Sequence, residues 1–272
     1  MTSSSSDSSS DIARLLEIMA KLRDPKTGCP WDRAQDYQSI VPFTLEEAYE
    51  VADTIERNAL DELPGELGDL LFQVIFYCQL GKEQGLFDFE QVVEKICRKL
   101  TERHPHVFGE LPLASSQEVK QTWESIKAGE RAGRSLTSVL DDIPLNLPAL
   151  SRAAKIQRRV ASHGFDWAEL EPVVAKVHEE IDEVLAEVQV SSPDATRVRE
   201  EMGDLLFAVV NLARHIGVDP EQALRLANSK FERRFRGVEA LAAASGKPLA
   251  QHTLAQLDSY WEQVKLAEKA KG

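Results

Sequence analysis

The chain has few cysteines, and their spacing fits no common cysteine motif. Its 272 residues contain three, Cys29, Cys78 and Cys97, which are scattered and form no Cys-x-x-Cys pair. An odd number at irregular spacing argues against a disulfide framework. We therefore expect free thiols in a reducing compartment, the cytoplasm.

Long apolar runs are also missing. No stretch reaches the length of a membrane-spanning helix, and the N-terminus lacks the positively charged start and apolar core of a signal peptide. The prediction is a cytoplasmic protein without a membrane partner. Residues 2–10 are nearly all serine, so we predict a disordered tail over residues 1–10.

Positive charge is in deficit. The 32 lysines and arginines face 45 aspartates and glutamates, which gives a formal net charge of −13. Such a surface repels phosphate backbones and anionic lipids, so no nucleic acid is expected as a partner. A small phosphate ligand held through metal ions remains compatible with this charge.

Strand patterns and several catalytic motifs are absent from the sequence as well. There is no P-loop or Rossmann glycine fingerprint, no serine or cysteine in a nucleophile elbow, and no alternating strand pattern with hairpin turns. Helical periodicity predicts an all-α fold, and Thr44 is the predicted N-cap of the second long helix. The expected helices are residues 11–22, 44–57, 66–81, 89–103, 116–128, 150–161, 172–188, 199–215, 220–243 and 253–270.

An acidic pattern occurs twice along the chain. In the second copy, Glu180 and Glu183 lie three residues apart and precede Glu201 and Asp204 of the EMGDLLF segment. This spacing places each pair on one helix face. A repeat of this length predicts two tandem helical bundles, residues 11–128 and 149–272, joined by a linker at 129–148. The first copy has the corresponding acids Glu47, Glu50, Glu66 and Asp69.

A single acidic pair on a helix is usually a solvated charged face. Here Asp69 and Asp204 lie in helices that are otherwise mostly apolar, which predicts that these helices are buried. A buried, unpaired carboxylate would cost several kcal/mol or become neutral. Because the arrangement also occurs twice with the same GDLLF sequence, we interpret it as a metal site.

The type of ligand indicates the metal. Carboxylate oxygens without cysteine or histidine suit Mg²⁺, with Mn²⁺ as the alternative, and not zinc. A di-iron bundle would need Glu-x-x-His pairs, which neither acidic helix has. Several carboxylates around Mg²⁺ imply more than one ion and a polyphosphate ligand.

Cationic and aromatic residues near the C-terminus suit such a ligand. Lys230 and Arg234 lie four apart on one predicted helix and could bind phosphate, while Trp261 and Lys265 could stack on a base and reach a phosphate. The alternatives are an ordinary charged helix face and a tryptophan of the core.

Together these residues resemble the MazG family of nucleoside triphosphate pyrophosphohydrolases, over a region from about residue 11 to the end. The resemblance implies an all-α fold with tandem MazG domains, a homodimer, Mg²⁺ dependence, and hydrolysis of nucleoside triphosphates to monophosphates and pyrophosphate. The motifs that carry it, besides the acidic repeats, are GCPWD at 28–32, RHPHVF at 103–108, DDIP at 141–144, GFDW at 164–167 and KFERRF at 230–235.

The resemblance also implies roles for residues of the second copy. Its metal ligands fall on Glu180, Glu183, Glu201 and Asp204, and Glu179 or Glu183 is the candidate to orient or deprotonate the attacking water. A lysine would be usual at the position of Arg197. The second copy is expected to be the main active one, and the first to stabilise the dimer or bind nucleotide weakly. The implied nucleotide contacts are Glu179, Arg197, Glu200, Lys230, Arg234, Trp261 and Lys265.

Two other functions stay open from the sequence. A non-catalytic helical module that senses nucleotides would bind them without Mg²⁺ and form no product. A di-metal phosphodiesterase or triphosphate phosphatase would use the same acids, and the phosphatase would release inorganic phosphate.

Overall fold

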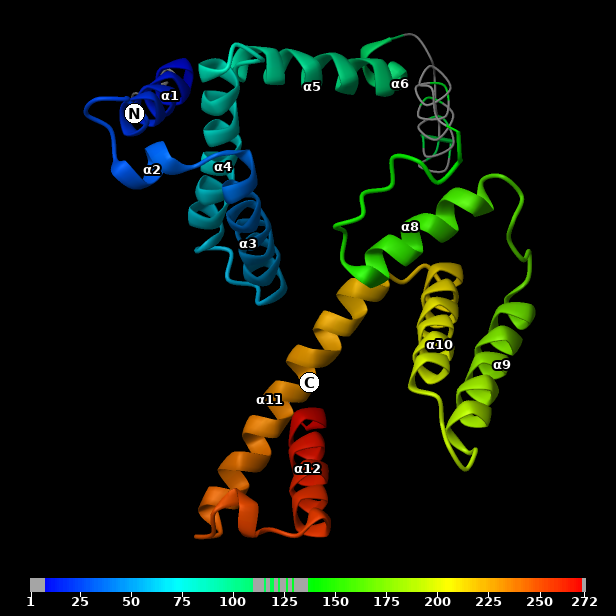
Figure 1. Cartoon of the computed structure of the whole chain (residues 1–272). Coiled ribbons are helices and arrows are strands. Elements are labelled where there is room, and N and C mark those ends of the chain that lie inside the picture. The colour runs from blue at the N-terminus through cyan, green and yellow to red at the C-terminus, as the bar shows by residue number, and fades with distance from the viewer. Residues whose placement is uncertain are drawn as a thin grey trace. The chain divides into compact units, whose positions relative to one another are not determined.

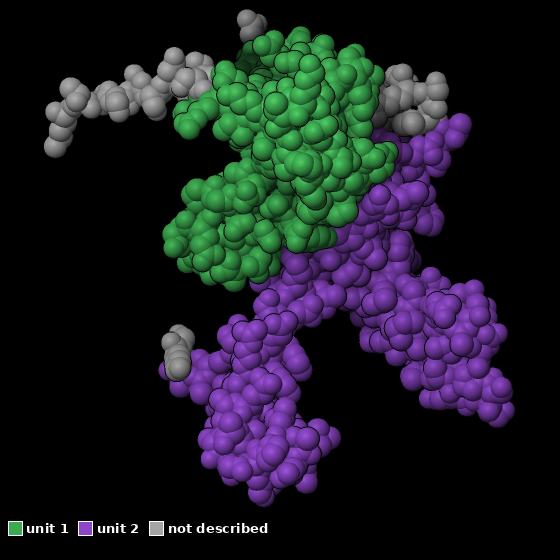
Figure 2. All heavy atoms as spheres, turned by 60° about the vertical axis from the view of Figure 1, so that its left-hand side comes forward, with its two compact units in different colours: residues 1–133 green, residues 134–272 purple. Residues whose placement is uncertain are grey.

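The computed structural model describes residues 8–109, 115, 118, 119, 122, 126, 129 and 137–270, and in this part of the chain every regular element is a helix. The chain divides into two compact units, Met1–Gly133 and Arg134–Gly272, which Figure 2 colours separately. The helix expected over 116–128, with Trp123 and Lys127, falls largely outside the described residues. So do residues 1–7 of the expected tail.

Unit 1 is built around an antiparallel pair of long helices, α3 and α4, against which α1 packs (Figure 1). Its core consists of Met19 from α1, Ile40 from α3, and Ile75, Phe76 and Leu80 from α4. The apolar residues of α4 recur on the face turned toward α1 and α3, as the helical period requires. The helices are α1 (Ser8–Leu22), α2 (Pro30–Ala34), α3 (Tyr37–Glu56), α4 (Leu63–Glu83), α5 (Phe89–Arg103) and α6 (Pro105–Phe108).

The predicted N-cap at Thr44 is wrong. Helix α3 begins seven residues earlier, at Tyr37, because Asp36 and Ser39 form a capping box: the Asp36 side chain accepts from the Ser39 amide, and the Ser39 side chain accepts from the Asp36 amide. Thr44 lies inside the helix, where its hydroxyl bonds to the Ile40 carbonyl oxygen.

The expectation that the apolar helix is buried all round is also wrong. In α4 the buried residues begin at Gln73, while Leu67 in the first half is 48% exposed and Asp69 is exposed. Asp204 is likewise exposed in the second copy. Of the four acids of the second copy, the buried one is Glu180, on the partner helix of the pair.

Unit 2 repeats the antiparallel pair as α9 and α10, with α8 packed against α10 (Figure 1). Its last two long helices form a hairpin, in which a Cβ on Gly237 would meet the Val264 side chain at 2.8 Å, so glycine permits the close approach. Figure 1 shows α12 running beside α11 and apart from α9 and α10. The elements are α8 (Ala149–Ala161), α9 (Leu170–Val188), α10 (Ala195–His215), α11 (Pro220–Ala244), the 3₁₀ helix η1 (Leu249–Gln251) and α12 (Leu254–Lys269).

The described part of the expected linker, residues 137–148, is fastened to α8. Arg159 of α8 donates to the Val139 carbonyl oxygen at 2.7 Å and pairs with Asp142 at 3.0 Å, and Ile143 is buried. The boundary between the two units falls between Gly133 and Arg134, before this segment. Among the described helices, none combines the length and apolar character needed to cross a membrane.

The core of unit 1 gives a first prediction. Phe76→Ala removes a fully buried ring and should lower the free energy of unfolding of unit 1 by about 3–5 kcal/mol, because a cavity remains. Urea denaturation followed by circular dichroism measures this change. Val107→Ala, at an exposed position, should stay within about 0.5 kcal/mol. Equal effects of the two variants would contradict this core assignment.

Candidate metal and nucleotide site

Three acids of unit 2 meet between α9 and α10. Glu180 and Glu183 come from α9 and Glu201 from α10, and one carboxylate oxygen of each lies within 4.8 Å of the others. The spacing along each helix puts the acids on the face turned to the partner helix. Asp204 is not part of this trio but lines a pocket together with Glu180. We call Glu180, Glu183, Glu201 and Asp204 the acidic cluster.

The electrostatics of the acidic cluster favour a cation. Glu180 is only 4% exposed; its Oε1 lies 2.7 Å from the Lys176 ammonium, while its buried Oε2 has no hydrogen-bond partner. Desolvation and the neighbouring Glu180 charge raise the pKa of Glu183. A hard cation would satisfy the unpartnered oxygen and offset the repulsion, so the donor set fits Mg²⁺ or Mn²⁺.

Two basic residues already border the acidic cluster. Lys176 pairs with Glu179 at 3.0 Å as well as with Glu180, and hydrogen bonds to these carboxylates raise its pKa. Arg197 lies 3.2 Å from Glu187, 3.3 Å from Glu201 and 3.9 Å from Glu200. The structure thus brings Glu179, Arg197 and Glu200 to the cluster.

Lys176 is a site residue that the sequence reasoning missed. It lies four residues before Glu180, on the same face of α9, and that spacing was a readable signal. In the first copy the residue four before Glu47 is Phe43, so the cation has no counterpart there.

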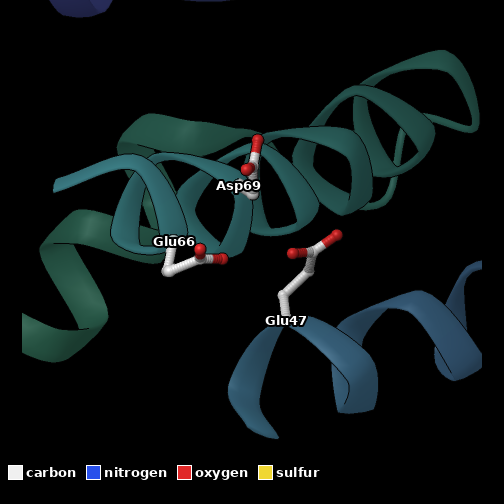
Figure 3. Close-up of side chains that lie close together, drawn as sticks. All are labelled: Glu47, Glu66 and Asp69. Atoms are coloured by element: carbon white, nitrogen blue, oxygen red, sulfur yellow. The ribbon is translucent and has the colours of Figure 1, made fainter. Parts of the chain in front are cut away.

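The first copy forms a similar group. Figure 3 shows Glu47 of α3 reaching toward Glu66 and Asp69 of α4, and oxygens of the three lie within 4.8 Å of one another. Glu50 is outside this trio. Burial, followed by the charge of Glu50, raises the pKa of both Glu47 and Glu66. Both copies therefore concentrate negative charge between a pair of antiparallel helices.

The predicted phosphate and base contacts near the C-terminus gather in a different place. The Arg234 guanidinium lies 5.9 Å from the Trp261 ring centroid and bonds to Glu268 at 2.8 Å. Lys265 pairs with Glu262 at 2.7 Å, and Lys230 shares α11 with Arg234. In the described ranges, no ion pair joins these α11–α12 residues to the acidic cluster of the same chain.

A pocket of about 590 Å³ opens beside the acidic cluster. Glu180, Asp204 and Lys176 line it on the side of the cluster, and Asp166 and Arg214 are its other charged lining residues. The remaining wall combines apolar and aromatic side chains with a few polar groups, as small-molecule sites usually do. These other lining residues are Ile156, Gln157, Val160, Gly164, Phe165, Asp166, Trp167, Val173, Phe207, Ala208, Asn211 and Arg214.

The GFDW segment closes one side of this pocket. Gly164 has φ +85°, a left-handed conformation that suits glycine and ends α8. Asp166 then accepts from Arg214 at 2.5 Å and lies 3.0 Å from His215 Nε2. Burial raises the pKa of Asp166, but the hydrogen bonds from Arg214 and His215 outweigh it and hold that pKa below its ordinary value. The ionised Asp166 fixes the segment to α10.

The sequence matches the family described as the MazG nucleotide pyrophosphohydrolase domain at residues 35–108 and 169–238. The two matched segments contain the two acidic groups. The chain belongs to this family, and both the all-α fold and the tandem arrangement expected from the sequence are confirmed.

Named relatives extend this match over nearly the whole chain. The nucleoside triphosphate pyrophosphohydrolase of Escherichia coli K12 is 55% identical over 257 residues, which cover 94% of this chain and 98% of the relative. The nucleoside triphosphate pyrophosphohydrolase/pyrophosphatase MazG of Thermotoga maritima is 42% identical over 251 residues, covering 92% and 94%. A Mycobacterium tuberculosis protein with the same name as the E. coli relative is 34% identical over 153 residues, covering 56% and 46%.

The raised pKa of Glu183 gives a second prediction. At a pH below 4.5, the ordinary pKa of glutamate, the Glu183 carboxyl is neutral in both the folded and the unfolded chain. At a pH above its raised pKa in the folded chain, it is charged in both states, and the repulsion in the acidic cluster then destabilises the fold. Without metal, the melting temperature of Glu183→Gln should therefore exceed that of the wild type increasingly as pH rises through this window.

Added Mg²⁺ should raise the melting temperature of the wild type, since it binds only the folded cluster, and should raise that of Glu183→Gln much less. Asp182→Asn removes the same charge from an exposed neighbouring position outside the cluster and serves as the control. An equal Mg²⁺ response in Glu183→Gln and the wild type would contradict the assignment of this ligand.

Proposed function

We propose that the protein is a Mg²⁺-dependent nucleoside triphosphate pyrophosphohydrolase, which converts nucleoside triphosphates to monophosphates and pyrophosphate. The observation that supports this most is the buried, unpartnered oxygen of Glu180, in a cluster of carboxylates at one end of a pocket of nucleotide size. The printed names of the E. coli and Thermotoga relatives agree with this activity.

Glu180, Glu183, Glu201 and Asp204 would hold Mg²⁺. When bound, Mg²⁺ supplies charge compensation for the triphosphate and makes a coordinated water more acidic. The protein's own contribution is to orient the water and to accept its proton. Glu183 and Glu179, which lies one helical turn before it on α9, are the two candidates for this step.

Lys176 and Arg197 would offset the charge of the phosphates at the same place. Both are already paired with acids, so they would exchange carboxylate partners for phosphate oxygens. Attack of the water on the α-phosphorus then releases pyrophosphate.

Lys230, Arg234, Trp261 and Lys265 would act from a second copy of the chain. They lie on the α11–α12 hairpin, which does not reach the acidic cluster of its own unit. A homodimer that places this hairpin over the partner's acidic cluster would add the cations needed by a triphosphate. Exposed apolar residues on α10 and α11 support such an interface; they include Leu206, Val209, Leu224 and Phe231.

The identity of the products gives a third prediction. With ATP and Mg²⁺ the purified protein should form AMP and pyrophosphate, and with chelator it should form neither; ion-exchange chromatography separates the products. ADP and phosphate would keep the metal site but move the attack to the γ-phosphorus. Binding of nucleotide without any product would favour the sensing module.

Substitutions in each copy test which of the two carries this activity. Glu183→Gln should lower kcat by about 10²- to 10⁴-fold while the circular dichroism spectrum stays unchanged, because a water-activating carboxylate is lost. Asp182→Asn should leave kcat unchanged. Glu50→Gln, the same change in the first copy, should have little effect if the second copy carries the activity. An active, folded Glu183→Gln protein would overturn the role of this residue.

A further inference from the structure

The pocket beside the acidic cluster borders a second buried oxygen without a partner, Oε1 of Gln157. Gln157 lies on α8 and is 4% exposed, and its Nε2 donates to the Phe207 carbonyl oxygen at 2.8 Å. Because a carbonyl oxygen only accepts, the amide nitrogen must face it. The orientation of the amide is therefore fixed, and Oε1 is left as a buried acceptor without a partner, on a side chain that lines the pocket.

Asn211 presents the complementary group. Its Oδ1 accepts from Arg214, with 3.1 Å to Nε and 2.8 Å to Nη2, so its Nδ2 is the remaining donor. Asn211 lies one turn after Phe207 on α10. Gln157 contacts the carbonyl oxygen of Phe207, which points along the helix toward the turn that contains Asn211. The two amides therefore lie close together among the residues that line the pocket, and they leave one acceptor and one donor for a ligand.

The surroundings of this amide pair suit a flat aromatic ring. Val160, Phe165, Trp167 and Phe207 provide apolar and aromatic wall, and Glu180 and Asp204 of the acidic cluster line the same pocket. A nucleotide whose phosphates lie at the acidic cluster would direct its base into this wall. Proteins commonly hold an extruded base in this way, by stacking and by hydrogen bonds to its Watson–Crick edge.

The first copy shows that the fold does not need these amides. The segment RLLEIM at 14–19 aligns with RAAKIQ at 152–157, which matches Met19 to Gln157. Aligning Glu66 with Glu201 matches Phe76 to Asn211. Met19 and Phe76 are both fully buried in the same core cluster. The copy with apolar residues at these positions is closed by its core, whereas the copy with amides has an open pocket.

We infer that Gln157 and Asn211 read the Watson–Crick edge of the substrate's base. Gln157 Oε1 accepts from an amino or ring N–H group, and Asn211 Nδ2 donates to the adjacent ring nitrogen or carbonyl oxygen. This inference rests on the proposed function and adds the base subsite to it. Each common base has a donor beside an acceptor on its Watson–Crick edge. The amide pair therefore recognises this donor–acceptor pair and does not select one base strongly over the others.

The test compares ATP with purine riboside triphosphate, which lacks only the 6-amino donor. In the wild type, kcat/KM should favour ATP by about tenfold, because the analogue leaves the Gln157 oxygen unpaired. In Gln157→Met, which installs the residue of the first copy, the value for ATP should fall to that for the analogue. Lys155→Met, at an exposed position on the same helix, should keep the preference. An unchanged ratio in Gln157→Met would overturn the inference.

Methyl triphosphate, which has no base, separates this inference from the proposed function. Its hydrolysis should be the same in the wild type and Gln157→Met. A loss for all three substrates together would mean damage to the acidic cluster and would count against a role in base reading. If the wild type hydrolyses none of them, the proposed function fails. The inference is then tested by binding. The ratio of the dissociation constants for the α,β-methylene analogues of ATP and purine riboside triphosphate is compared between the wild type and Gln157→Met.

A second variant covers the case in which Gln157→Met does not fold. Asn211→Ala removes the donor and should abolish the preference for ATP over 1-deaza-ATP, which lacks the N1 acceptor. Circular dichroism and the melting temperature establish that each variant is folded. A preference that persists in folded Asn211→Ala would contradict the assignment of this residue.

Discussion

The candidate site of unit 2 depends on one buried carboxylate, Glu180, in which only one of the two oxygens has a partner. Lys176 compensates Oε1 of Glu180, while Oε2 is buried without a partner. Burying a charge in this way costs free energy, so the packing of α8, α9 and α10 must compensate for it. The same packing brings Glu183 and Glu201 toward Glu180 and raises the pKa of Glu183. The fold thus maintains a local excess of negative charge that a bound cation would relieve.

This constraint also explains the positions of the basic residues. Lys176 and Arg197 lie one helical turn from Glu180 and Glu201, the acids of the cluster that they contact, so they reduce the repulsion without saturating the acidic cluster. A site fully neutralised by lysine and arginine would have no affinity left for a metal. The cations on α11 and α12 are instead occupied by Glu262 and Glu268 of their own hairpin. Their action on the acidic cluster therefore belongs to the proposed homodimer.

The sequence predicted the helices and the acids because both follow from short-range spacing. The repeat of four acids identified α3–α4 and α9–α10 as pairs, and α5 lies where it was expected, at Phe89–Arg103. Which acid would be buried could not be read in this way, because burial depends on how α9 packs against α10 rather than on the apolar residues within either helix. The pocket was missed for the same reason: Gln157 and Asp166 lie far from Asn211 in the sequence, and they meet it only after α8 has packed on α10.

The two copies differ in the residues that fill the space next to their three carboxylates. Each places three carboxylates between antiparallel helices, but the first copy packs Met19 and Phe76 where the second has Gln157 and Asn211. Apolar residues close a core and add stability, whereas a buried amide oxygen without a partner, such as Oε1 of Gln157, reduces it. A polar, incompletely satisfied wall is therefore a cost to folding that a bound molecule can offset. The second copy bears this cost beside its acidic cluster, and the first, with the same acids, has used the equivalent space to stabilise its fold.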